Sequence, residues 1–341
     1  MPSPWGAPAP MPYPQPRPPL EPPDGLEFHQ LLRGGRPGWW WVGIPGVIVL
    51  VIAWILAQVA LIVPFLAGLM ASGRSLDSSL DYLADLEHPT PLALAYLNLG
   101  LASAIPLAFL AMWAFHGLRP GWLTSVVPRM RWGYFAVCLA LSFVALIATV
   151  VVSLLLPRDG TGQVTGELAG FDDRALQFIL VVIFLTPFQA AGEEYLFRGY
   201  LTQAIGSLVP PGLRLRWLGR TLAVSIPAVL FALAHGVGQP PPVFFDRLAF
   251  GLVAGVLVIA TGGLEAAIAM HVLNNFVAFG FAIALGEMDT ALNPQEATWW
   301  ILPSTLTQSF VYLGLAVLVA RAMRLRRTAD PTVLVASRTR V

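Results

Sequence analysis

The sequence of 341 residues is dominated by long apolar stretches, each of a length that fits a helix crossing a lipid bilayer. Such a helix needs about 20 consecutive, mainly apolar residues, and its backbone must satisfy its own hydrogen bonds inside the hydrocarbon. The composition agrees, since 56% of the residues are hydrophobic, 11% are charged and the mean hydropathy is +0.70. Soluble globular chains carry about 25% charged residues. The sequence therefore predicts an all-α integral membrane protein.

Eight stretches match this template, which predicts a polytopic bundle of eight transmembrane helices. The expected helices run over Trp39–Met70, Leu92–His116, Tyr134–Leu156, Arg174–Ile205, Thr221–Val237, Phe244–Ala260, Leu264–Leu285 and Trp299–Met323. The segment before them, residues 1–38, is rich in proline and has no apolar period. We expect a disordered cytoplasmic tail there.

The arginines, which supply all 20 basic residues, alternate along the chain in a way that predicts topology. Fifteen of them lie in the two tails and the even-numbered connections, and only four lie in the odd-numbered ones. Arginines gather on the cytoplasmic side of spanning helices. Both termini should therefore be cytoplasmic, with residues 324–341 forming a basic tail. The net charge of +1 and the scattered arginine clusters argue against a nucleic-acid partner.

Ionisable and amide side chains interrupt three of the expected helices. The fourth helix carries Glu193, Glu194 and Arg198, the fifth carries His235, and the seventh carries His271, Asn274 and Asn275. An ionisable group near the bilayer centre costs at least about 2.5 kcal/mol by insertion scales. Three helices bearing such groups predict one shared polar cavity.

Helical spacing indicates which of these side chains lie on the same face. Glu194 and Arg198 are four residues apart with the acid first, which favours an ion pair. Glu193 lies about 100° around the helix and is expected to face the cavity. His271 and Asn275 share a face and present two hydrogen-bond donors to one bound oxygen.

Other polar residues in these helices have simpler interpretations. Gln58, Asn98, Gln189 and Gln308 are interpreted as packing or hydrogen-bonding groups. His29 and His116 are assigned no specific role. A lone Glu–Arg pair can also serve only to lock two helices together.

Three motifs together give a more specific signal. "EEYLFRG", "FALAH" and "HVLNN" resemble the EExxxR, FxxxH and HxxxN motifs of the CAAX-protease and bacteriocin-processing family of intramembrane proteases. The resemblance divides the chain into three N-terminal helices (39–173), a CAAX-protease-like core (174–285) and a last helix (286–323).

The resemblance implies an intramembrane endopeptidase acting on a membrane-associated peptide or protein in the lipid bilayer. The use of arginine without lysine suggests a GC-rich genome, so we expect a bacterial cytoplasmic membrane. By the family's assignments, Glu193 and His235 activate a water, and His271 and Asn275 stabilise the oxyanion. Glu194 with Arg198 holds this arrangement in place, and Glu194 is counted in the catalytic group. Arg198 and Phe231 support it. The alternatives are a catalytically idle bacteriocin-immunity or scaffold protein, or a transporter.

Metal use stays open at the level of sequence. Glu193, His235 and His271 are residue types that hold zinc in other hydrolytic sites, and the family is commonly labelled a metalloprotease. The same residues also suit a glutamate-activated water, and we favour that metal-free mechanism. One difficulty concerns depth, because the predicted helix ends place His235 and His271 toward opposite faces. Either the fifth helix starts earlier than Thr221 or it lies deep in the bundle. Kinks at Pro187 and Pro227 would also change the depths of the fourth and fifth helices.

Overall fold

The computed structural model describes residues 25–85, 88–155, 168–212, 214–236, 238–292 and 297–336. Within these ranges the chain is helical, with two isolated β-bridges and no β-strand. Eight helical segments are long and apolar enough to cross a membrane. The predicted all-α, multi-pass architecture is confirmed.

The first four spans lie within residues 40–206, and two of them are composite. The first is α1 (Gly43–Ala71), and the short α2 (Leu76–Ala84) follows it. The second joins α3 (Pro91–Ala102) to α4 (Ala104–His116), and the third is α5 (Trp132–Leu155). The fourth comprises α6 (Asp173–Glu194), the π-helix η4 (Tyr195–Leu201) and α7 (Thr202–Gly206).

The second half contains four further spans and two short helices. The spans are α8 (Arg216–Ala234), α9 (Pro241–Thr261), α10 (Glu265–Leu285) and α12 (Ile301–Ala322). The short helices are α11 (Met288–Leu292) and α13 (Pro331–Ala336). The predicted ends at Leu156 and Val237 lie outside the described residues.

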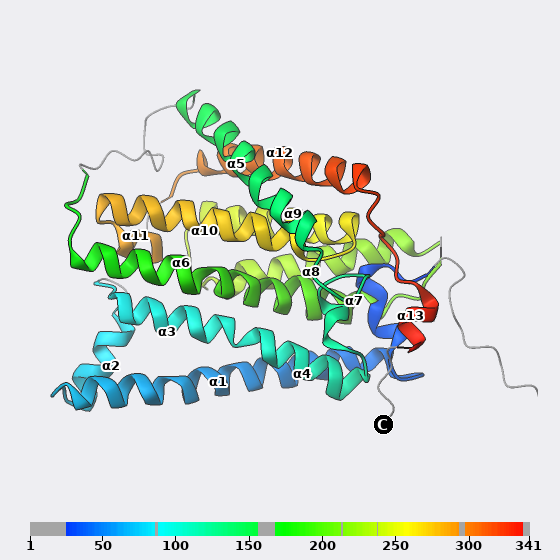
Figure 1. Ribbon diagram of the computed structural model, residues 1–341, viewed down its shortest axis with the longest axis horizontal. Coiled ribbons are helices and arrows are strands. Elements are labelled where there is room, and N and C mark those ends of the chain that lie inside the picture. Colours follow the sequence, from blue (N-terminus) through cyan, green and yellow to red (C-terminus); the bar gives the residue numbers. More distant parts are fainter. Residues whose placement is uncertain are drawn as a thin grey trace, which may run out of the picture.

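Helix α6 lies in the middle of the bundle (Figure 1). It packs against α3 on one side and α10 on the other, while α10 also contacts α5. Helices α8 and α9 pack against each other, and α12 joins α9 to α5. This arrangement brings the polar residues of α6, α8 and α10 toward one interior region.

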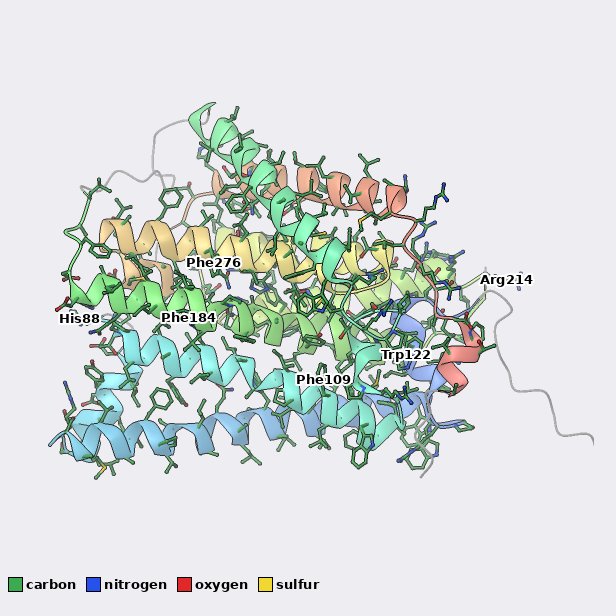
Figure 2. The ribbon with its side chains drawn as sticks, viewed as in Figure 1. His88, Phe109, Trp122, Phe184, Arg214 and Phe276 are labelled. Atoms are coloured by element: carbon green, nitrogen blue, oxygen red, sulfur yellow. The ribbon has the colours of Figure 1, made fainter. Side chains whose placement is uncertain are left out.

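The two ends of the bundle differ in charge. Exposed Arg214 marks one end, named here the arginine-rich end, and exposed His88 marks the other (Figure 2). Helix α10 begins at the arginine-rich end, where Glu265 forms an ion pair of 2.6 Å with Arg131. Both ends of the described chain also lie there, because Ala329 donates a backbone hydrogen bond of 2.8 Å to Leu26.

The prediction of a disordered tail over residues 1–38 is wrong for its last part. Residues 1–24 lie outside the described residues, but Phe28–Gly34 form a 3₁₀ helix, η1. Apolar burial explains this order, since the side chains of Phe28 and Leu31 are fully buried against the arginine-rich end. The proline-rich composition masked this short apolar segment.

A buried carboxylate fastens η1 to the start of α8. Both Arg216 and Arg220 donate hydrogen bonds to Glu27, with Arg220 Nε at 2.8 Å from Oε2. Burial alone would raise the pKa of Glu27, but these two arginines outweigh it and hold the pKa below its ordinary value. The pair of guanidinium groups therefore fixes where α8 begins.

Next to this carboxylate, His29 is fully buried and neither ring nitrogen has a hydrogen-bond partner among the described residues. Burial lowers the pKa of His29 to about 4, although Glu27 at 3.6 Å acts in the opposite direction. An unfolded histidine titrates near 6.5, so the unfolded chain binds the proton first. The contribution of neutral His29 to the free energy of unfolding is therefore complete above about pH 6.5. It is lost as the pH falls toward 4, because the unfolded chain takes up the proton and the folded chain does not.

We predict that His29→Leu reduces the acid sensitivity of the fold. Thermal unfolding of the parent and variant in detergent should be compared at pH 7 and pH 5, a range in which Glu27 stays ionised in the folded state. Between pH 7 and pH 5, the Tm of the parent should fall by more than the Tm of the variant. An equal loss in both proteins would show that His29 does not contribute.

Candidate active site

The two adjacent glutamates at the end of α6 have different surroundings. Glu194 is fully buried, and its Oε1 accepts a hydrogen bond of 3.0 Å from Arg198, which is also buried. The guanidinium of Arg198 lies 4.0 Å above the ring of Phe231. The predicted Glu194–Arg198 pair is therefore confirmed, and Phe231 supports it from below.

The chain adopts a π-helix directly after the two glutamates. Its wider turns leave main-chain groups without their usual α-helical partners, and Thr202 Oγ1 donates to the carbonyl of Phe197 at 3.1 Å. Such π segments are rare and occur often at functional sites. Here the segment carries Arg198 back over Glu194. Nothing in the sequence pattern predicted it.

His271 bridges the two glutamates. Its Nδ1 lies 2.9 Å from Glu194 Oε1, and its Nε2 lies 3.5 Å from Glu193 Oε2. An ionised carboxylate only accepts hydrogen bonds, so Nδ1 carries a hydrogen. Glu194 therefore fixes the orientation of His271 and keeps a hydrogen on its Nδ1.

His235 follows the last residue of α8, and a backbone carbonyl holds its ring. The Nδ1 atom lies 2.8 Å from the carbonyl oxygen of Phe231, so Nδ1 carries the hydrogen and Nε2 is left as an acceptor. The ring of Phe231 lies between the two histidines, with centroids 4.5 Å from His235 and 6.1 Å from His271. Both histidines therefore lie against the same phenyl ring.

The depth conflict between His235 and His271 is resolved by the start of α8. This helix begins at Arg216, five residues before the predicted Thr221, and its first turn is fastened to Glu27 outside the bundle. The helix continues through Pro227 without ending. His235 therefore lies closer to the arginine-rich end than predicted, near enough to His271 for both imidazole rings to contact Phe231.

A cavity of about 310 Å³ collects these side chains. Its lining includes Glu193, Phe231, His235, His271 and Asn275. Glu194 and Arg198 do not line it and lie behind His271. A larger surface hollow of about 530 Å³ lies between Pro240–Pro242 and Ala297–Trp300, and none of the described residues that line it is titratable.

Gln189, interpreted from the sequence as a packing residue, joins the two sides of the cavity. Its Nε2 donates to Glu193 Oε1 at 2.8 Å, and its Oε1 accepts from Asn275 Nδ2 at 2.8 Å. Because the carboxylate only accepts, the direction of both hydrogen bonds is fixed. Gln189 therefore orients Glu193 and Asn275 together. The signal in the sequence was its spacing of four residues before Glu193.

Other polar residues of the lining were also outside the predicted site. Asn98 of α3 donates to Thr186 of α6 at 3.1 Å, which agrees with its predicted hydrogen-bonding role. Gln239 donates to the carbonyl of His235, and Arg247 of α9 lies in the cavity wall. Gln239 lies in the loop before α9, whose path a single sequence does not reveal.

The arrangement can be tested against a zinc site. The donor types fit, since Nε2 of His235, Nε2 of His271 and a carboxylate oxygen of Glu193 suit zinc. Within the part of the chain that the structure describes, however, no group of three His, Cys, Asp or Glu side chains is close enough to hold one metal ion. As arranged, these residues do not form a metal site.

Comparison with known proteins supports the resemblance seen in the motifs. Residues 175–277 match the family model described as type II CAAX prenyl endopeptidase Rce1-like. No curated protein and no solved structure matches the chain. The matched segment contains all the motif residues, and it supports a CAAX-type protease within a multi-pass membrane protein.

We predict that Arg198→Ala lowers the yield of folded protein. It leaves Glu194 as a buried carboxylate without its guanidinium, a change that costs about 3 to 5 kcal/mol for buried pairs. The double variant Glu194→Gln with Arg198→Gln carries no such charge and should recover part of the yield. Monodisperse protein after detergent extraction measures this. Equal losses in the single and double variants would contradict the pairing.

For Gln189→Leu we expect a fall in kcat of about 10- to 100-fold with KM little changed, because one hydrogen bond to a charged group contributes about 1.5 to 3 kcal/mol. The matched control is Gln308→Leu, the same change in α12, where Gln308 accepts from Thr149 at 3.4 Å. A kcat for Gln189→Leu equal to that of the control would show that Gln189 only packs.

Proposed function

We propose that the chain is an intramembrane endopeptidase that hydrolyses a peptide bond of a membrane-associated peptide or protein. The observation that carries this proposal is the meeting of a carboxylate, two histidines and two amides from α6, α8 and α10 around one cavity. Hydrolysis of a peptide needs a proton acceptor and an oxyanion stabiliser, and this set offers both.

Glu193 is placed to accept the proton of the attacking water. Its Oε1 accepts from Gln189, while its Oε2 lies 3.5 Å from His271 Nε2 and has no hydrogen bond to any described residue. Nε2 of His235 is a second acceptor, because Nδ1 donates to Phe231. A water held between these two acceptors loses a proton to Glu193 as its oxygen attacks the peptide carbon. The same proton passes to the leaving amine when the C–N bond breaks.

His271 and Asn275 are placed to stabilise the negative charge that develops on the peptide oxygen. Nδ1 of His271 is bound to Glu194, so Nε2 can donate only when the ring is protonated. In its protonated form, His271 stands beside the carboxylates of Glu193 and Glu194 and can donate from both ring nitrogens. Asn275 uses one N–H for Gln189 and keeps the other. Together they offer two donors to an oxyanion.

Glu194 and Arg198 act behind the reacting groups. Glu194 holds His271 at 2.9 Å, and Arg198 balances the charge of Glu194 at 3.0 Å. Neither side chain lines the cavity. We therefore assign both to positioning, the role that the resemblance implies for them, and Glu194 does not act on the substrate directly.

The main prediction concerns turnover of a membrane-anchored peptide, identified by screening the parent protein in detergent against a peptide library. Glu193→Gln should lower kcat about 10²- to 10⁴-fold, as expected for loss of a general base. Asn275→Ala should lower it about 10²- to 10³-fold by removing an oxyanion donor. Parental turnover in both variants would refute the site, and a parent that cleaves no peptide would favour an immunity or scaffold role.

Metal removal gives a separate prediction. Because the three candidate ligands do not converge, dialysis against a chelator should leave turnover unchanged. Activity that disappears on chelation and returns with added zinc would show that Glu193, His235 and His271 rearrange around a metal.

A further inference from the structure

The candidate active site is closed at the arginine-rich end of the bundle. There the segment η1 packs against α7, and the 3₁₀ helix η3 (Pro120–Leu123) packs against α4 and the π-helix. Phe28, Trp122 and Tyr200 are fully buried in this layer. Hydrogen bonds hold the layer closed, since Gln203 donates to the carbonyl of Trp122 at 2.8 Å and His116 contacts Tyr200 at 3.0 Å.

The cavity extends in the opposite direction. His271 lies six residues after the start of α10, about 9 Å along the helix at 1.5 Å per residue. Ala278 and Phe279, farther along α10, also line the cavity, as do Ala291 and Leu292 of α11, which follows the far end of α10. Among the described residues, no lining residue comes from η1, η3 or α7.

Exposure rises along this path. His271 is buried, Asn274 and Asn275 are half-buried, and Ala278 is exposed. Leu97 of α3 is also exposed on the opposite wall. The open side of the cavity therefore lies in the half of the bundle remote from the arginines.

We infer that a substrate enters this site from the extracytoplasmic side of the membrane. The arginine-rich end is the cytoplasmic one by the distribution of fifteen against four arginines, and it is the end that the structure closes. The partner that fits is an extended segment of an exported or outer-leaflet peptide. The identity of this occupant rests on the proposed function, but the direction of access does not.

Cysteine labelling tests the direction without any assay of activity. The parent chain has one cysteine, Cys138, which is buried. The variant Cys138→Ala has no cysteine and is the unlabelled control. On that background, Ala278→Cys and Leu292→Cys report on the cavity. His88→Cys and Arg214→Cys report on the two ends of the bundle. Each variant is exposed to a membrane-impermeant maleimide in intact bacterial cells and in inside-out vesicles.

We expect Ala278→Cys and Leu292→Cys to be labelled in intact cells together with His88→Cys, whereas Arg214→Cys is labelled only in inside-out vesicles. Labelling of both cavity positions only from the Arg214 side would overturn the inference. So would labelling of His88→Cys only in inside-out vesicles, which would reverse the topology. Protection of both cavity positions on both sides, with the end controls labelled, would refute an aqueous opening. None of these outcomes depends on proteolysis.

Discussion

The buried contact among Arg198, Glu194 and His271 is the interaction on which the rest of the site depends. It places two opposite charges at 3.0 Å and an imidazole at 2.9 Å inside a membrane protein, where an isolated ionised group is costly. Because Glu194 satisfies His271 through Nδ1, the other nitrogen is presented beside Glu193. The two glutamates thus have different roles: Glu194 orients His271, and Glu193 faces the cavity.

A second constraint lies outside the hydrocarbon. Glu27 binds the first turn of α8 through Arg216 and Arg220, and so sets how far His235 reaches along the bundle. Gln189 then couples Glu193 to Asn275 across the cavity. The hydrogen bonds of Glu27 therefore position α8 and, through α8, His235. The hydrogen bonds of Gln189 position Glu193 and Asn275.

Much of this was predictable from the sequence where the signal is local. Apolar length identified the eight spans, and spacing of four residues identified the Glu194–Arg198 pair. The order of η1 and the role of Gln189 were missed, because both depend on contacts between segments more than 80 residues apart. The π-helix was missed because its backbone geometry has no distinct composition. The same limit applies to α8, whose early start is set by Glu27.

The central claim is that these side chains surround a single reacting peptide bond. An experimental structure of Glu193→Gln with an uncleaved peptide, determined in a lipid nanodisc, tests it most directly. The account predicts a backbone carbonyl oxygen within hydrogen-bond distance of His271 Nε2 and Asn275 Nδ2, with the carbonyl carbon facing residue 193. A peptide bound elsewhere, or one whose carbonyl groups contact neither His271 nor Asn275, would contradict it.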